Sequence, residues 1–311
     1  MRQFKRILAG VDLASGDRLV AEELTEANEE AVGRAIWLAQ RNDAELTFQY
    51  CLDVSPKAEA MLRQSGEHHA DVLRSADEGL ALLVERARAE GVDADFHVVF
   101  GRSWLELIHQ VERGQHDLLI VGTRRLGKIE GVLLGSTGVK LLRYCPCPVW
   151  VTKPLNGRKF DSILVAHDMR PVGELALRLG CGLASFDHAQ LHVLHAAEIP
   201  ELEGMPWGVD VDATVAVHRR TIERVLWAQL GEHHLPLPPQ LHYSLLPADE
   251  AILNAIEKYA VDVAVMGTLG RTGIPGLMVG NTAERLLPRI DCSVLAIKPT
   301  DFRSPVPSKP V

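Results

Sequence analysis

The sequence predicts an α/β protein built from two tandem doubly wound domains. The chain has 311 residues, which is about two domains of ordinary size. An internal repeat relates its two halves at an offset of 145 residues. Short apolar runs alternate with amphipathic stretches in each half, as strands and helices do in a doubly wound sheet. Length, repeat and alternation therefore indicate the same fold class.

The repeat is clearest at the fourth expected strand of each copy. Asp117–Thr123 matches Asp262–Thr268, and the same offset relates Cys147 to Cys292. A constant offset through two turns and a helix is not expected by chance. We therefore place one domain at residues 1–155, a second at residues 159–299 and a flexible, proline-containing tail at residues 300–311.

The offset changes near the start of each copy. Ile7–Asp12 pairs with Ile163–Asp168 at an offset of 156 instead of 145. The second copy is therefore shorter by 11 residues, at some point between its first and fourth strands.

Each copy is expected to contain five strands separated by helices. The strands are near-continuous apolar runs, as in parallel sheets that are covered on both faces. Those of the first copy are Ile7–Val11, Glu45–Cys51, Phe96–Phe100, Leu118–Gly122 and Val149–Thr152, and those of the second are Ile163–His167, Gln190–Ala196, Leu241–Leu246, Val263–Gly267 and Val294–Lys298. Such sheets bind ligands beyond the carboxyl ends of their strands, where the strand order reverses.

Composition excludes several classes of function. The net charge is −8, which gives no general attraction to nucleic acid or to anionic membranes. No apolar run approaches the ~20 residues that a membrane-spanning helix needs. The five cysteines are an odd number spread over a long chain, which favours reduced thiols in the cytoplasm over a disulfide framework.

Glycines follow the fourth strand of the second copy and precede its next helix. Gly267, Gly270 and Gly280 would let the backbone approach a phosphate closely, and free N–H groups at the start of that helix could hold its charge. Asn281 or Thr282 could cap the helix. The alternative is plain turn chemistry, in which one glycine ends the strand and another precedes the helix.

A P-loop interpretation of the first copy can be rejected. Gly122–Ile129 follows the P-loop spacing up to its last position. That position requires Ser or Thr, whose hydroxyl ligates Mg²⁺, and Ile129 cannot do so.

The glycine spacing resembles the nucleotide loop of universal stress proteins. In that loop Gly-x-x-Gly is followed by nine residues and then by Gly-Ser or Gly-Thr; here Gly267 and Gly270 are followed by Gly280-Asn281. The stretches Gly267–Ile274 and Gly280–Glu284 look most like the tandem universal stress protein E subgroup. The resemblance extends to about Pro299.

The resemblance implies a five-stranded sheet of order 3-2-1-4-5 in each copy, with ATP across the ends of strands 1 and 4. It implies that an aspartate after strand 1 contacts the adenosine part and that a valine on strand 2 lies beside the adenine. These positions are Asp168 and Val193. The family serine and a later threonine are replaced by Asn281 and Ala283. The sequence does not indicate whether Mg²⁺ accompanies the nucleotide.

The first copy departs further from the family pattern. Its corresponding ligand-binding residues would be Asp12, Gly122, Gly135 and Ser136. Arg125 replaces the second glycine, and Phe48 replaces the valine. We therefore expect at most one tightly held nucleotide per chain, in the second copy.

The function favoured by this comparison is stress-related binding of ATP or another adenine nucleotide, with occupancy passed to an unidentified protein partner. A nucleotide-free scaffold is the alternative, and a slow ATPase ranks last because the sequence offers no general base. The two copies are expected to pair about a pseudo-two-fold axis through their fifth strands, whose edges need covering. The sequence leaves open whether whole chains form a homodimer.

Two other groups of residues were considered as metal sites. Cys145-Pro146-Cys147 lacks the redox Cys-x-x-Cys spacing, so packing is the favoured role. The pairs His68-His69 and His233-His234 have no Cys or carboxylate at ligand spacing. We assign no metal and no catalytic residue to the sequence.

Overall fold

The fold is described from a computed structural model of the chain. It describes residues 3–14, 19–21, 23–123, 135–155, 157–197, 210–268, 281–287 and 289–308.

Strands and helices alternate through both copies. The first copy contains β1 (Arg6–Val11), α1 (Glu26–Asn42), β2 (Glu45–Leu52), α2 (Pro56–Gln64), α3 (Glu67–Ala89), β3 (Ala94–Phe100), α4 (Ser103–Gly114), β4 (Leu118–Gly122), α5 (Ser136–Tyr144) and β5 (Val149–Thr152). The second contains β6 (Ser162–Ala166), α6 (Pro171–Asp187), β7 (Gln190–Ala196), α7 (Val211–Leu230), β8 (Gln240–Ser244), α8 (Ala248–Lys258), β9 (Val263–Gly267), α9 (Asn281–Leu286) and β10 (Ser293–Ile297).

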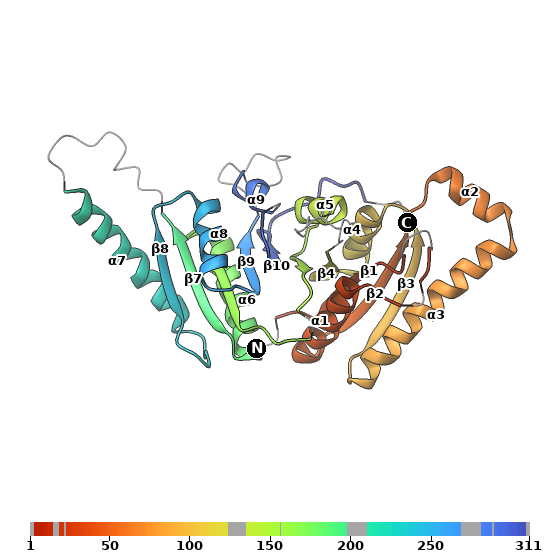
Figure 1. Cartoon of the computed structure of the whole chain (residues 1–311), viewed down its shortest axis with the longest axis horizontal. Coiled ribbons are helices and arrows are strands. Elements are labelled where there is room, and N and C mark those ends of the chain that lie inside the picture. The colour runs from red at the N-terminus through yellow and green to blue at the C-terminus, as the bar shows by residue number, and fades with distance from the viewer. Residues whose placement is uncertain are drawn as a thin grey trace.

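The described strands form one ten-stranded sheet in the order β3-β2-β1-β4-β5-β10-β9-β6-β7-β8 (Figure 1). Within each copy all pairs are parallel and the order is 3-2-1-4-5, which confirms the fold class and the expected order. The copies meet through β5 and β10, which pair antiparallel. The prediction that the fifth strands cover each other's edges is therefore confirmed.

Helices cover both faces of this sheet. Buried side chains of α1, α3, α6 and α7 pack in one hydrophobic cluster, and those of α4, α5, α8 and α9 pack in another. Ile7, Leu8 and Leu119 are fully buried, as the apolar runs predicted. One expected strand was too long at its end, because β8 stops at Ser244 and Leu245 is exposed.

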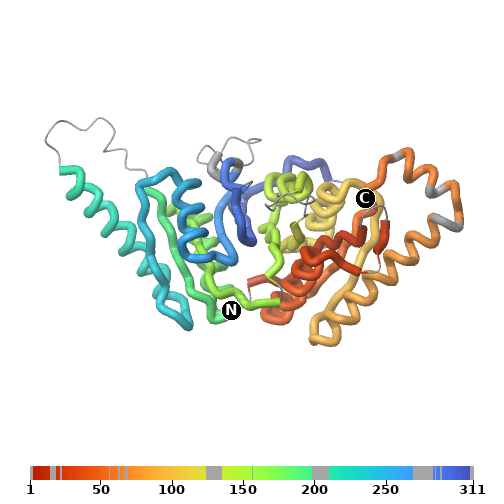
Figure 2. Tube along the Cα trace, viewed as in Figure 1, coloured from red at the N-terminus to blue at the C-terminus, as the bar shows by residue number. Residues whose placement is uncertain are grey.

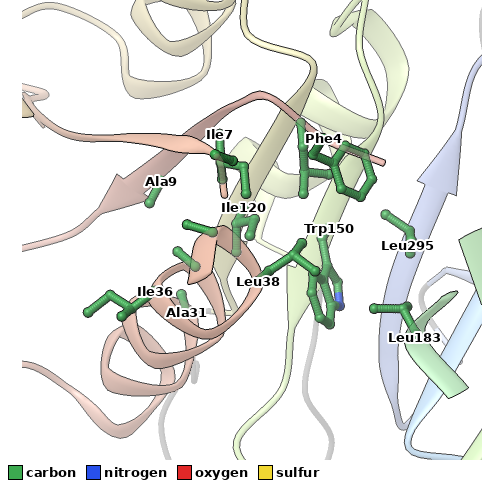
Figure 3. Close-up of a cluster of buried hydrophobic side chains, with 14 of the residues drawn as sticks. Phe4, Ile7, Ala9, Ala31, Ile36, Leu38, Ile120, Trp150, Leu183 and Leu295 are labelled. Carbon is green, nitrogen blue, oxygen red and sulfur yellow. The ribbon is translucent and has the colours of Figure 1, made fainter. Parts of the chain in front are cut away.

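The first cluster is continuous across the two copies. Trp150 of β5 is fully buried near Leu38 of α1 and Leu183 of α6 (Figure 3). Its ring also packs against that of Phe160, at a centroid distance of 5.8 Å. Each copy thus completes part of the other's hydrophobic core at the junction.

The described residues after β10 lie against the first copy. The tube in Figure 2 leaves β10 and passes onto the first copy. Val306 is buried there, and the Nε2–H of His109 on α4 donates to the carbonyl oxygen of Pro307 at 3.2 Å. Residues 300–308 pack against the first copy although they form no helix or strand. Burial of the apolar Val306 side chain favours this packing. The prolines of the segment have no backbone N–H that would need a hydrogen-bond partner.

Candidate functional site at the carboxyl edge

Asp168 lies just beyond the carboxyl end of β6, in the turn that enters α6. Its Oδ1 accepts a hydrogen bond from the backbone N–H of Arg170 at 3.0 Å, and the intervening Met169 has a left-handed φ of 60°. Asp168 is exposed to solvent. Because β6 pairs with β9, the turn lies beside Gly267, the last residue of β9. The structure thus brings together two of the residues that the resemblance singled out.

Gly267 has a packing role at this edge. A Cβ there would lie 2.8 Å from Cγ1 of Val172, in the first turn of α6. The counterpart Gly122 has the same role, since its Cβ would lie 2.5 Å from the carbonyl oxygen of Ala27 in α1. Both distances are shorter than real Cβ contacts, so each glycine lets the first helix approach the fourth strand. Chain packing therefore accounts for both glycines, whether or not a ligand binds there.

The two copies differ beside the aspartate. In the second copy Gly173 lies next to Asp168, and a Cβ on it would be 2.6 Å from Asp168 Oδ1. In the first copy Asn28 takes that position in the helix. Its Oδ1 accepts from the N–H of Asp12 and its Nδ2 donates to the carbonyl oxygen of Asp12, both at 3.0 Å. The space kept open by Gly173 is thus filled in the first copy.

The eleven-residue difference between the copies falls at the same place. Asp12 and Asn28 are 16 positions apart, whereas Asp168 and Gly173 are 5 positions apart, and from there to the fourth strand the offset between the copies is 145. The extra residues of the first copy therefore all lie between β1 and α1.

Described residues of this longer connection contact the core of the first copy. Leu13 is buried, and Leu19 is partly buried against the hydrophobic core. The hydroxyl of Tyr50, near the end of β2, donates to the carbonyl oxygen of Leu19. Asp12 is half-buried, in contrast to the exposed Asp168.

The remaining predicted residues are distributed as follows. Val193 is fully buried in the middle of β7, where it pairs with Val165, and its counterpart Phe48 is fully buried in β2. Asn281 begins α9, and Ser136 begins α5 directly after Gly135. Gly270, Gly280 and Arg125 lie outside the described residues, as does the P-loop-like segment after Thr123. Thr282 is the second residue of α9.

A group of aromatic side chains between the sheet and α7 was missed by the sequence analysis. It comprises His167, His195 and Tyr243 at the ends of β6, β7 and β8, and His218 on α7. The Nδ1–H of His195 donates to the carbonyl oxygen of His167 at 2.8 Å. His218 Nδ1 and the Tyr243 hydroxyl are 2.9 Å apart.

Within this group His167 has a defined protonation state. Its Nδ1 accepts from the backbone N–H of Met169 at 3.0 Å, so the ring proton lies on Nε2. Nε2 is buried, with the side chain of Gln229 on α7 near it. Burial lowers the pKa of His167 below its usual range. The counterparts of His167 and Tyr243 in the first copy are the apolar residues Val11 and Val98. A comparison of the strand ends of the two copies in the sequence would therefore have revealed this group.

The candidate metal ligands are dispersed or buried. Cys145 and Cys147 place their sulfur atoms 3.6 Å apart, and burial raises the pKa of the Cys147 thiol well above its usual range. Both sulfurs lie in the core, which supports the packing role. Within the described part of the chain, no three His, Cys, Asp or Glu side chains form a group that could hold a metal ion. Nor does any described helix have the length and apolar character to cross a membrane.

Comparison with known proteins identifies the family to which the chain belongs. The universal stress protein family matches residues 3–153 and again residues 159–298. The chain therefore belongs to the universal stress protein family, and it carries two family domains in tandem.

Two curated relatives match this chain over most of their own length. The chain is 26% identical over 310 residues to universal stress protein E of Photorhabdus laumondii, covering 93% of this chain and 96% of that protein. It is also 26% identical to universal stress protein E of Escherichia coli K12, with 93% and 95% covered. A crystal structure of a universal stress protein from Archaeoglobus fulgidus superposes with a TM-score of 0.66 at 20% identity, over 94% of this chain and 98% of that one. This last similarity supports the fold.

Proposed function

We propose that the protein binds an adenine nucleotide, ATP, in its second copy, and that occupancy of this site controls contacts with a protein partner in the cytoplasm. The proposed ligand-binding residues are Asp168, Val193, Gly267, Gly270, Gly280, Asn281 and Thr282.

The observation that carries the proposal is the contrast between two aspartates. Asp168 is exposed at the carboxyl edge, with Gly173 beside it and the end of β9 adjacent. Its counterpart Asp12 is half-buried and held by Asn28. A doubly wound sheet binds ligands at this edge, next to the strand pair where the order reverses, and β6 and β9 are that pair. This contrast supports placing the nucleotide in the second copy.

Calorimetric titration of ATP into the purified full chain tests the proposal. We expect one site per chain. Gly280→Val should abolish binding, because the added side chain would meet the phosphates. Asp168→Ala should weaken binding by about 1–3 kcal/mol, because it removes a charged hydrogen-bond partner of the ligand. The matched variants Gly135→Val and Asp12→Ala, in the first copy, should leave the affinity unchanged.

Two equivalent sites in the wild type, or undiminished binding by Gly280→Val, would contradict the assignment of the site. If no ATP binds, and mass spectrometry finds no nucleotide released from the purified protein, the nucleotide-free scaffold becomes the favoured function. Phosphate release at saturating ATP would indicate the third alternative, a slow ATPase.

A further inference from the structure

Helix α7 presents an unusual surface at one end of the molecule (Figure 1). Of its twenty residues only Leu226 and Leu230 are buried. Val217 and Trp227 are 56% and 50% exposed. Large apolar side chains on a helix normally face the core, so these exposed side chains make α7 a candidate contact surface.

A groove lies beside Trp227. It has a volume of about 380 Å³ and is formed between the last turn of α7 and the segment that leads to β8. Its lining is mostly apolar and comprises Trp227, Leu230, Gly231, His233, Leu235, Pro236, Leu237, Pro238 and Pro239. Leu237 is 41% exposed at this groove. Three prolines fix the backbone of one wall, so little conformational entropy is lost when an apolar side chain enters.

Two arginines extend the surface along α7. Val217, Arg220, Arg224 and Trp227 recur at helical spacing and therefore share one face of the helix. Arg219 pairs with Glu223 at 2.7 Å, but neither Arg220 nor Arg224 forms an ion pair with another described residue. We call the groove together with Arg220 and Arg224 the α7 surface.

The positive charge of the α7 surface favours an acidic binding partner over a second copy of α7. In a symmetric pairing of α7 with α7 of a second copy, the two arginines of each helix would approach those of the other near the axis, and like charges there oppose association. A segment with carboxylates would pair with them instead. The groove next to them accepts an apolar side chain.

We propose that the α7 surface binds a segment of a partner protein in which one large apolar residue is flanked by aspartates or glutamates. The apolar side chain occupies the groove against Trp227, and the carboxylates pair with Arg220 and Arg224. This binding mode is independent of the proposed nucleotide site and can be measured without nucleotide.

The test uses a displayed library of random 12-residue peptides, selected on the full-length protein and counter-selected on the double variant Arg220→Glu, Arg224→Glu. Enriched peptides are then titrated, as fluorescein conjugates, by fluorescence polarisation. We expect enriched sequences to combine one Trp, Phe or Leu with two or more acidic residues. Trp227→Ala should lower their affinity at least about tenfold, as loss of a central aromatic contact does. The Arg220→Glu, Arg224→Glu variant should lower it by a comparable factor, and 0.5 M NaCl should weaken wild-type binding.

A matched control lies at the opposite end of the sheet. Leu82 of α3 is 65% exposed, and Leu82→Ala should leave peptide affinity unchanged. The proposal is overturned if no peptide is enriched, if enriched peptides lack acidic residues, or if Trp227→Ala binds them as tightly as the wild type. It is also overturned if sedimentation shows a dimer that Trp227→Ala dissociates, or if the surface binds phosphatidylserine vesicles and no peptide.

Discussion

Trp150 of β5 lies directly opposite Leu295 of β10, and these two residues are each other's counterparts in the internal repeat. The neighbouring pairs obey the same rule, since Val151 faces Val294 while their counterparts Ala296 and Val149 face each other. A register of this kind requires a two-fold axis between the paired strands. The tandem chain therefore joins its copies as a symmetric dimer would. The symmetry is broken on the axis itself, where the indole of Trp150 faces the smaller side chain of Leu295.

The indole at this junction should be a major source of stability. Trp150→Ala removes a fully buried ring that contacts Phe160, and we expect a loss of about 3–5 kcal/mol in the free energy of unfolding. Urea unfolding followed by circular dichroism measures it. Leu82→Ala, at an exposed position, should change the free energy by no more than about 0.5 kcal/mol. Equal effects of the two substitutions would contradict the role of Trp150.

A buried ion pair also joins the copies. Arg34 of α1 is 2.6 Å from Glu30 and 3.8 Å from Asp187, which ends α6 in the other copy. Its Nη2 also donates to the carbonyl oxygen of Arg158 at 2.5 Å. Arg34→Ala would leave two buried carboxylates without their cation, and we expect a loss of about 3–5 kcal/mol, measured as above.

The matched control for Arg34 is an exposed ion pair between α3 and α1. Arg86 lies 2.9 Å from Glu29, and both side chains are nearly half exposed. Arg86→Ala should therefore lower the free energy of unfolding by less than about 1 kcal/mol. If Arg34→Ala costs no more than Arg86→Ala, the buried pair does not hold the copies together.

Stability should fall in acid because of His116. Burial and the nearby Arg6 guanidinium lower the pKa of His116 to about 4 in the folded protein, whereas the unfolded value is about 6.5. The unfolded chain therefore binds the proton more readily, so His116 contributes stability above pH 6.5 that is lost as the pH falls toward 4.

The repeat supplies the substitution that tests this. The counterpart of His116 is Val261, which is buried at the same place in the second copy. His116→Val should fit, and the difference in urea midpoint between pH 7 and pH 5 should become smaller. His234→Asn, at an exposed position, should leave that difference as it is in the wild type. An unchanged pH dependence in His116→Val would show that other groups cause the acid sensitivity.

The parts of the fold that the sequence predicted depend on local patterns. Apolar runs predicted the strands, and the repeat offset predicted that Asp168 and Gly267 occupy equivalent positions in the topology to Asp12 and Gly122. The packing of Val306 against α4, by contrast, depends on a contact between the end of the chain and a helix almost 200 residues earlier, and no local pattern encodes it. The ring group around His195 was missed because three strand ends and one helix supply its members.

The site itself could be predicted only in outline. The resemblance identified Asp168, but the feature that distinguishes the copies is the residue beside it, and Asn28 and Gly173 became counterparts only when packing on Gly122 and Gly267 aligned the helices. The eleven-residue difference was visible in the sequence, whereas its position between β1 and α1 was not.

Gly173 should therefore control nucleotide binding under the proposed function. A Cβ at this position would lie 2.6 Å from Asp168 Oδ1 and 3.0 Å from the Asp168 N, so Gly173→Ala must displace the aspartate or the start of α6. We expect ATP affinity to fall at least about tenfold in calorimetric titration, since displacing the aspartate loses its hydrogen bond to the ligand. Asn28→Ala is the matched change in the first copy. It removes two hydrogen bonds to Asp12 but should leave the affinity and the single-site stoichiometry as they are, because Leu13 of the longer connection stays buried in that copy. A second ATP site in Asn28→Ala would mean that Asn28 alone closes the first copy, and unchanged affinity in Gly173→Ala would mean that the nucleotide lies away from Asp168.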